Sequence, residues 1–473
     1  MKKERALIQP SNLHKMTQKI KPKTTQTSPD GACVGVTIQP GQHPITNDMI
    51  DKDALFVLKT LQKAGYCGYL VGGGVRDLYL GKTPKDFDIS TDARPGQLRK
   101  LFPRSNTIGR RFRLVQVFFR GGNIIEVSTL RSFSEYDIDG PEAVLAPNNT
   151  FGTLHEDARR RDLTINSLFY EIQNQTIIDY VKGSEDLNSS IIRIVGDPEK
   201  RLTRDPVRML RAIRHAARNN FIIEDLSWSA ICKNAPKLTL CPPSRLRDEL
   251  IKDLYSEASA PWFTLALDSG LFYALFPVYK NMLNPETEAG QKQRELLKNL
   301  FSTIDNLNAL CKTNQIHRQK DFFLFALLLT PVVEETLQLY TIFRKGAALF
   351  HLGKQIRRNL DQGIGIQLNL RKSLRQEVVS LLINLAQLIH HRQQDDWPKW
   401  LKKKSYFKRT ELFYQCYLAA TTNTPIELSH ISNKLPLPPA TEPSTSSPQT
   451  TEPFQHTPVI LKNHKGGIFG FKR

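Results

Sequence analysis

The spacing of apolar residues changes along the chain, and the change falls near residue 205. Between residues 48 and 195, short apolar runs are separated by Gly and Asn, which is typical of strands joined by turns. Within this region, residues 53–64 and 97–102 carry apolar positions three and four apart, which predicts helices. The runs expected to form strands are 69–71, 87–90, 114–119, 124–130 and 191–195.

After residue 205 the helical spacing dominates, and no alternating strand pattern stands out. The clearest helical stretches are 296–310, 321–329 and 374–389. The chain is therefore predicted to be α+β, with a small mixed-sheet head followed by an all-helical neck and body.

Both ends of the chain lack this periodicity. The first 47 residues are polar and rich in Lys, Thr and Gln, and the segment 432–455 is rich in Pro, Ser and Thr. We therefore expect a disordered basic arm at 1–47 and a disordered, basic-ended tail at 432–473. Between them we place the head at 48–195, the neck at 196–260 and the body at 261–431.

The charge balance indicates a polyanionic partner. Lys and Arg number 66 against 46 Asp and Glu, which gives a formal net charge of +20 over 473 residues. Such an excess favours nucleic acid or an acidic membrane surface. Because no uncharged apolar stretch approaches the ~18 residues of a spanning helix, no membrane span is expected and nucleic acid is favoured.

The six cysteines are scattered and contain no C-x-x-C pair, so neither a zinc site nor a disulfide framework is expected. This usage fits a reducing compartment, and we expect the protein in the cytoplasm. Residues 1–29 contain one acid, Glu4, and no apolar core of the kind that a secretory signal needs. A basic arm and an organelle transit peptide both fit this segment.

Three glycines follow the first apolar strand, in the run Gly72-Gly73-Gly74-Val75-Arg76-Asp77. Glycine lets the backbone approach a phosphate closely, and the start of the following helix presents free N–H groups to an anion. Arg76 would add a charged fork for a triphosphate. On its own, the same run also fits a tight strand-to-helix turn.

Two aspartates follow, at positions 86 and 88. If both lie in one strand, Asp86 and Asp88 point the same way, since residues two apart share a face. Carboxylates held this close repel unless a cation lies between them, and Mg²⁺ is bound by one or two carboxylates together with substrate phosphates. An exposed strand face with Lys85 as the counter-charge is the alternative.

A third acid is a candidate for the same site. The runs 114–119 and 124–130 are joined by a predicted hairpin turn at 120–123. Glu126 lies on the face opposite Ile125 and Val127 of the second run. Glu126 would join the two aspartates if this strand neighbours theirs; an ordinary solvent-facing Glu fits equally.

Two arginine-rich stretches come next. The run 159–161 is all Arg and is followed by Asp162, which suits phosphate and ribose contacts or, alternatively, a charged helix start. The second stretch opens with Asp205 and Pro206, a favourable N-cap and first helical residue. Arginines then recur every third residue and form a stripe along one side of the helix, at Arg208, Arg211 and Arg214.

Together these features resemble the class II nucleotidyltransferases, the group that holds bacterial poly(A) polymerases and tRNA CCA-adding enzymes. The resemblance covers roughly residues 50–260. Its elements are the Gly-Gly-x-Val-Arg-Asp turn, the pair of aspartates two positions apart, the Arg161-Asp162 motif and the helix with Asp205-x-x-Arg208. The head is therefore expected to be a nucleotidyltransferase domain.

The resemblance implies the roles of the residues. Asp86 and Asp88 would hold two Mg²⁺ ions, with Mn²⁺ as a substitute. With Glu126, the candidate from the hairpin pattern, and Asp162, they make up the predicted catalytic residues. Gly73 and Arg76 would meet the triphosphate of ATP. The remaining nucleotide-binding residues would be Arg161 and Asp162 against the nucleotide, Asp205 and Arg208 at the base edge, and Arg211 and Arg214 close by.

Within the group, the run Gly109-Arg110-Arg111-Phe112-Arg113 and the 205–212 helix resemble the poly(A) polymerase type. The predicted activity is addition of AMP from ATP to RNA 3′ ends with release of pyrophosphate. One departure is Arg204, where the group normally has Glu. A CCA-adding enzyme is the first alternative, and a non-catalytic RNA-binding protein on a decayed scaffold is the second.

A basic stretch near residue 400 interleaves lysines with aromatic residues. Such a stretch suits single-stranded RNA, because lysines can contact the phosphates and aromatic rings can stack on the bases. A solvated helix face with its rings packed inward is the alternative. The predicted RNA contacts are Lys399, Lys402, Lys403, Lys404, Lys408 and Arg409.

Overall fold

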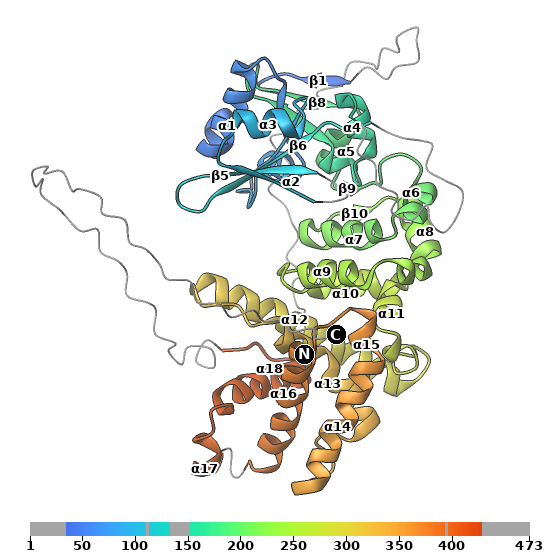
Figure 1. Cartoon of the computed structure of the whole chain (residues 1–473). Helices are drawn as coiled ribbons and strands as arrows, with labels where there is room; N and C mark the ends of the chain where they lie inside the picture. The colour runs from blue at the N-terminus through green and yellow to red at the C-terminus, as the bar shows by residue number, and fades with distance from the viewer. Residues whose placement is uncertain (1–34, 110–112, 133–150, 393–395, 428–473) are drawn as a thin grey trace, which may run out of the picture. The chain divides into compact units, whose positions relative to one another are not determined.

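The computed structural model describes residues 35–109, 113–132, 151–392 and 396–427 (Figure 1). Residues 1–34 of the predicted arm, the whole predicted tail and residues 110–112 of the polymerase-type run lie outside the described residues. No helix in the described ranges combines the length and the apolar character needed to cross a bilayer.

An eight-stranded mixed sheet forms the head, with the strand order β1-β8-β7-β2-β3-β6-β5-β4. All neighbouring strands are antiparallel except β3 and β6, which are parallel. The strands are β1 (Val36–Ile38), β2 (Gly68–Val71), β3 (Asp88–Thr91), β4 (Ser105–Ile108), β5 (Leu114–Phe118), β6 (Ile124–Thr129), β7 (Leu168–Glu171) and β8 (Thr176–Asp179).

The first strand corrects the predicted boundary of the arm. β1 falls inside the range 1–47, yet it pairs with β8 along the edge of the sheet, with Val36 opposite Asp179. Its three residues are too short a run to show an alternating pattern, and their backbone partners come from a strand about 140 residues away. The ordered head therefore begins before residue 48.

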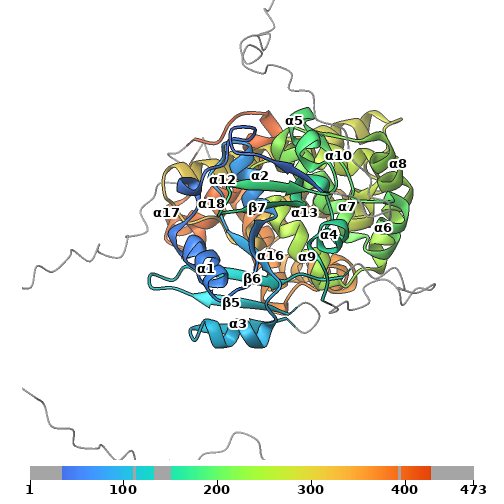
Figure 2. The same cartoon turned by 90° about the horizontal axis from the view of Figure 1, so that it is seen from above.

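Short helices pack against the sheet (Figures 1 and 2). α1 contacts β2, β3 and β6, and α3 contacts β4 and β5. Asp51 caps α1 by accepting from the N–H groups of Asp53 and Ala54. The head helices are η1 (Asn47–Met49), α1 (Lys52–Lys63), α2 (Gly73–Tyr79), α3 (Pro95–Leu101), α4 (Leu154–Arg160), η3 (Thr164–Asn166) and α5 (Gly183–Ser189).

The neck is helical apart from β10 (Ile222–Ile223), which pairs in parallel with β9 (Ile191–Ile192) at the end of the head. β10 departs from the prediction that no strand follows residue 205, because two residues are too few to show a period. The neck helices are α6 (Pro198–Arg204), α7 (Val207–Asn219), α8 (Asp225–Asn234), η4 (Ala235–Leu240) and α9 (Pro243–Leu254).

The body consists of helices around a core rich in aromatic side chains. α13 is buried along most of its length, and Phe323 meets Phe413 of α18 edge-on at a centroid distance of 5.2 Å. Its helices are α10 (Ser259–Asp268), α11 (Leu271–Leu275), η5 (Pro277–Tyr279), α12 (Glu288–Thr313), α13 (Asp321–Leu337), α14 (Gly346–Gln362), α15 (Ile364–Gln367), α16 (Lys372–His390), α17 (Lys399–Lys402) and α18 (Phe407–Thr422).

Candidate active site

Two carboxylates face each other across the parallel pair of strands in the head. Asp88 of β3 lies in register with Glu126 of β6, so the two residues are cross-strand neighbours. The strand of Glu126 does adjoin that of Asp88, which was the condition for Glu126 to join the site. Asp86 differs from the expectation, because β3 begins at Asp88 and Asp86 lies in the loop before it.

The other two acids nevertheless influence Asp88. Burial raises the pKa of Asp88 to about 6, and repulsion from Glu126 and Asp86 acts in the same direction. Arg161 and Arg211 oppose this rise in pKa. A carboxyl whose ionisation is disfavoured by neighbouring acids is relieved by a bound cation.

A hydrogen bond orients Glu126. Gln116 of β5 donates from its Nε2 to the Oε1 of Glu126 at 2.9 Å, across an antiparallel pair in which the two residues are opposite. Sequence reasoning missed Gln116. Gln116 could have been identified from its position on the same face of the predicted hairpin as Glu126.

The glycine turn lies directly against Asp88. Gly72 has a φ of +69°, a conformation that glycine adopts without strain. A Cβ on Gly72 would stand 3.8 Å from the Oδ2 of Asp88 and 3.6 Å from Nη1 of Arg161. The turn, the carboxylate and the arginine therefore converge on one place.

Arg76 is bound within the protein. It is 4% exposed and donates to the Oδ1 of Asp77 at 2.7 and 2.9 Å and to the Oδ1 of Asn166 at 2.6 Å. His215 of α7 lies 3.3 Å from the same guanidinium, and burial lowers the pKa of His215 well below its usual value. Sequence reasoning missed the contribution of His215, because nothing in the spacing links α2 to α7.

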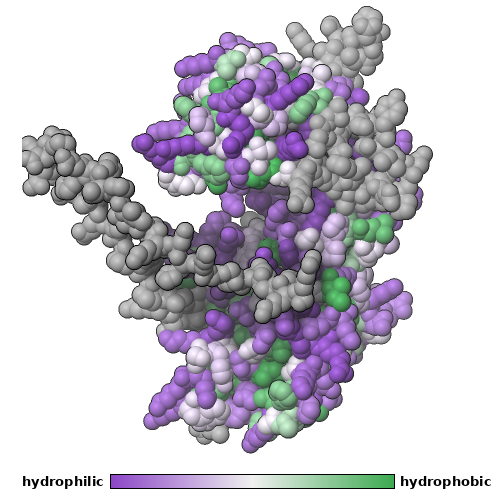
Figure 3. Space-filling view, viewed as in Figure 1, coloured by the Kyte–Doolittle hydropathy of each residue, from purple (hydrophilic) through white to green (hydrophobic). Residues whose placement is uncertain are grey.

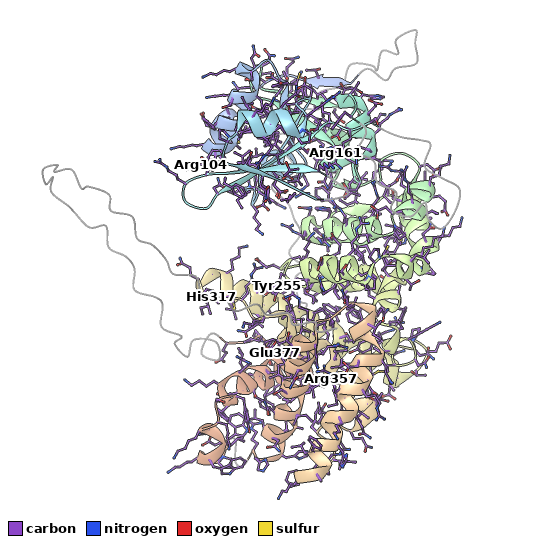
Figure 4. All side chains as sticks on the ribbon, viewed as in Figure 1. Arg104, Arg161, Tyr255, His317, Arg357 and Glu377 are labelled. Carbon is purple, nitrogen blue, oxygen red and sulfur yellow. The ribbon has the colours of Figure 1, made fainter. Side chains whose placement is uncertain are left out.

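Arg161 is held at the end of α4 and faces the site. Its guanidinium donates to Asp157 at 2.8 Å and to the hydroxyl of Ser90 at 3.2 Å, and it lies over the ring of Phe169. Figure 4 shows Arg161 on the head. The motif therefore comes after a helix rather than at a helix start.

Asp162 joins the head to the neck. It is buried, and its Oδ2 accepts from Nε of Arg211 at 2.6 Å. Although burial opposes ionisation, Arg211 and Arg208 hold the pKa of Asp162 far below its usual range. Asp162 is thus an anion with a specific cationic partner on α7.

Two neck arginines bind the carbonyl groups at the end of α4. Nη2 of Arg201 donates to the backbone oxygen of Arg161 at 2.6 Å, and Nη1 of Arg208 donates to the same oxygen at 2.9 Å. Arg208 also reaches the backbone oxygen of Arg160 at 3.2 Å. Cations are favourable at a helix C-terminus, where carbonyls lack partners. Arg201 had no signal in the sequence.

Asp205 does not cap α7, which corrects the prediction. α7 has Pro206 as its N-cap residue and no side-chain cap. Instead, the two oxygens of Asp205 accept from the two terminal nitrogens of Arg245 at 2.8 and 3.0 Å. Nε of Arg208 lies 3.5 Å from Asp205. A bidentate pair of this kind adds geometric specificity as well as energy.

Arg214 belongs to a separate buried group. It pairs with Glu249 at 2.6 Å and with Asp253, both on α9. The side chains of all three residues are at most 9% exposed. The stripe expected from the spacing therefore divides: Arg208 and Arg211 contact the end of α4 and Asp162, and Arg214 contacts α9.

The oxygen donors at Asp86, Asp88 and Glu126 are of the type that Mg²⁺ prefers. Among the described residues, no group of three or more His, Cys, Asp or Glu side chains is arranged to hold a metal by itself. Mg²⁺ commonly takes one or two carboxylates and completes its shell with waters and substrate phosphates. The donor set fits such a shared site.

With the geometry established, the chain can be compared with known families. The model described as "Poly A polymerase head domain" matches residues 68–193, which hold the glycine turn, the carboxylates and Arg161-Asp162. A second model, "Probable RNA and SrmB- binding site of polymerase A", matches residues 220–283. Over its head and neck, the chain is therefore similar to the class II nucleotidyltransferases.

The chain is similar to enzymes of both types. Poly(A) polymerase I of Salmonella typhi is 43% identical over 274 residues, 56% of this chain and 59% of that protein. Poly(A) polymerase I of Haemophilus influenzae is 38% identical over 61% of this chain and 65% of that protein. A CCA-adding enzyme of Lactobacillus helveticus is 40% identical over 46% of this chain and 53% of that protein. The chain spans about three fifths of the poly(A) polymerases it matches.

Solved nucleotidyltransferases share the fold. The Bacillus stearothermophilus CCA-adding enzyme in complex with CTP has a TM-score of 0.56 and 25% identity, and the match covers 79% of this chain and 78% of that chain. A tRNA-processing enzyme in an apo form has a TM-score of 0.52 and 20% identity. The predicted mixed-sheet head and helical remainder of the chain are therefore confirmed.

The basic stretch lies at α17 and the start of α18. Lysines 399, 402, 403, 404 and 408 and Arg409 are all exposed. Its rings divide into two kinds, because Trp397 and Phe407 are buried whereas Trp400 is 48% exposed. Lys402 pairs with Asp396 at 2.5 Å. The described surface in Figure 3 is largely hydrophilic.

Proposed function

We propose that this chain is a template-independent polynucleotide adenylyltransferase, which adds AMP from ATP to RNA 3′ ends and releases pyrophosphate. The observation that carries the proposal is the placement of Asp88 beside both Glu126 and the Gly72 turn, within a head matched by the poly(A) polymerase model. The similarity to poly(A) polymerases over the head and neck supports adenylate as the added unit.

In this mechanism the 3′-hydroxyl oxygen of RNA attacks the α-phosphorus of ATP, and the bond to the leaving pyrophosphate breaks. Asp86 and Asp88 would hold two Mg²⁺ ions, or Mn²⁺ in their place, which supply Lewis-acid chemistry when bound. Gln116 orients Glu126 beside them. Gly72 and Gly73 leave room for phosphate oxygens against the backbone.

Arginines stabilise the charge that develops on the phosphates. Arg161 adjoins both Asp88 and Gly72, so its guanidinium is placed to face a triphosphate. Arg76 borders Gly73, since a Cβ there would lie 3.5 Å from its Nη2. Fixed donors of this kind cost no reorganisation during the reaction.

Base choice is assigned to the neck. Asp205 and Arg208 are proposed to face the base edge, with Arg211 fixed by Asp162 beside them. Arg245 holds both oxygens of Asp205, and this partner sets the position of the carboxylate. We place RNA contacts on the exposed lysines near residue 400 and the protein in the cytoplasm, which suits its scattered free cysteines.

Substitution of the two aspartates tests the proposal. Asp88→Ala and Asp86→Ala are expected to abolish Mg²⁺-dependent release of pyrophosphate from ATP in the presence of RNA, while RNA binding persists. Asp48→Ala, at an exposed acid elsewhere in the head, serves as the control. Normal turnover in either site variant would refute the site, and no pyrophosphate release by the unaltered chain would favour a non-catalytic RNA-binding protein.

A CCA-adding enzyme is the second candidate, because one such enzyme is 40% identical over 46% of this chain and another shares its fold. On a tRNA lacking its terminus, that candidate would add two CMP units and one AMP. The adenylyltransferase would extend generic RNA with AMP alone.

A further inference from the structure

Aromatic side chains from three separate parts of the body form a connected, half-exposed surface. Phe343 precedes α14, His390 ends α16 and is followed by His391, and Trp400 lies in α17. The Phe343 ring is 4.8 Å from His390 and 5.7 Å from His391, and the Trp400 ring is 5.2 Å from His391. We call Phe343, His391 and Trp400 the aromatic platform.

The rings of the platform are not part of the core. Phe343 is 47% exposed and Trp400 is 48% exposed, whereas the neighbouring Trp397 is 8% exposed and donates its indole N–H to the Leu388 carbonyl. Trp397 therefore explains how α17 is anchored. Trp400 adds little to that anchoring and presents half of its surface to solvent.

Cations surround the platform. Nζ of Lys345 stands 4.7 Å from the centre of the Phe343 ring. Lys399, Lys403 and Lys404 flank Trp400 in sequence and are exposed. Exposed rings beside lysines match a ligand that carries both flat π-systems and a chain of negative charge.

We propose that the aromatic platform binds single-stranded RNA, with bases stacked on Trp400 and Phe343 and with phosphates contacted by Lys345, Lys399, Lys403 and Lys404. An acidic protein segment would match the lysines but would make no specific use of the rings. The inference rests on the proposed function, in which RNA is the substrate. The platform adds a holding site for RNA upstream of the reacting 3′ end.

Binding measurements test the platform without relying on catalysis. Trp400→Leu keeps an apolar side chain but removes the π-face, and Trp400→Phe keeps a ring. We expect Trp400→Leu to weaken the binding of an oligo(A) probe by roughly tenfold, and Trp400→Phe by less than about threefold. Phe343→Leu combined with Trp400→Leu should weaken binding further. Phe56→Leu, at a 55% exposed ring of α1, is the control.

The lysine contacts have a separate signature. Lys345→Gln should lower the slope of log affinity against log salt by about 0.7, the value for one phosphate contact on a single strand. In extension assays, Trp400→Leu should raise the KM for long RNA and leave kcat unchanged, because the platform lies outside the reacting carboxylates.

The platform is overturned if the double variant binds oligo(A) within about twofold of the unaltered chain, since stacking on even one base exceeds that effect. It is also overturned if Phe56→Leu loses as much affinity as Trp400→Leu, or if the unaltered chain does not bind oligo(A). The two proposals can fail separately. If the unaltered chain binds oligo(A) but incorporates no AMP, the adenylyltransferase proposal is refuted. If the platform variants of that chain then lose oligo(A) binding, the platform is still supported.

Discussion

Removal of Arg214 should destabilise the neck without impairing nucleotide use. Arg214 lies between Glu249 and Asp253, whose side chains are 9% and 0% exposed. Arg214→Met leaves two buried carboxylates without their shared cation. Breaking a buried pair in this way costs about 3–5 kcal/mol, which for a domain of this size corresponds to a fall in Tm of roughly 10 °C.

The dependence of this deficit on pH is a second readout. Without Arg214, burial raises the folded-state pKa values of the two acids above their unfolded values. An acid with a raised folded pKa binds its proton more tightly when folded, so the folded state loses stability as the pH rises. Thermal unfolding of Arg214→Met should therefore show a larger deficit at about pH 8 than at about pH 5.

A compensating variant separates charge from packing. Glu249→Met and Asp253→Leu added to Arg214→Met should recover most of the lost stability, because apolar replacement of a buried ionic group is often neutral or better. The KM for ATP should stay within about twofold of that of the unaltered chain. An unchanged Tm with a tenfold rise in this KM would refute the reasoning and would restore Arg214 to the nucleotide site.

Three other substitutions test neighbouring parts of the account. Gly72→Ala should lose AMP incorporation by roughly a hundredfold, because a Cβ strains the positive φ of the turn that lies beside Asp88; steady-state rates at saturating RNA measure this. Arg245→Met should reduce the ATP-over-CTP ratio of kcat/KM by roughly tenfold, since it frees both oxygens of Asp205; an unchanged ratio would contradict that role. Glu126→Gln should raise the Mg²⁺ concentration needed for half-maximal rate, and a Mg²⁺ titration showing no shift would place Glu126 outside the metal site.

Much of the head follows from short-range sequence patterns. The 114–119 and 124–130 runs form the expected hairpin, and alternation correctly places Glu126 on the face opposite Ile125 and Val127. The glycine run ends a strand and starts a helix, as its composition predicts. These features depend on residues close together in the chain.

The failures involve residues whose partners are distant. Asp86 lies outside β3 because the loop from α2 continues to that point, and alternation alone does not show where a strand begins. Asp205 satisfies the sequence rule for a cap, yet Arg245, 40 positions later, offers two charged donors instead. The platform joins Phe343 to Trp400 through His391, a proximity that no local pattern contains.

The central claim is that the carboxylates beside the Gly72 turn add adenylate to RNA without a template. The most direct measurement supplies generic single-stranded RNA, Mg²⁺ and one radiolabelled nucleotide at a time, and resolves the products by length. We predict a ladder of repeated AMP additions with ATP and little extension with CTP. Asp88→Ala should show no extension with either nucleotide. Extension limited to two CMP units and one AMP, and confined to tRNA, would contradict it.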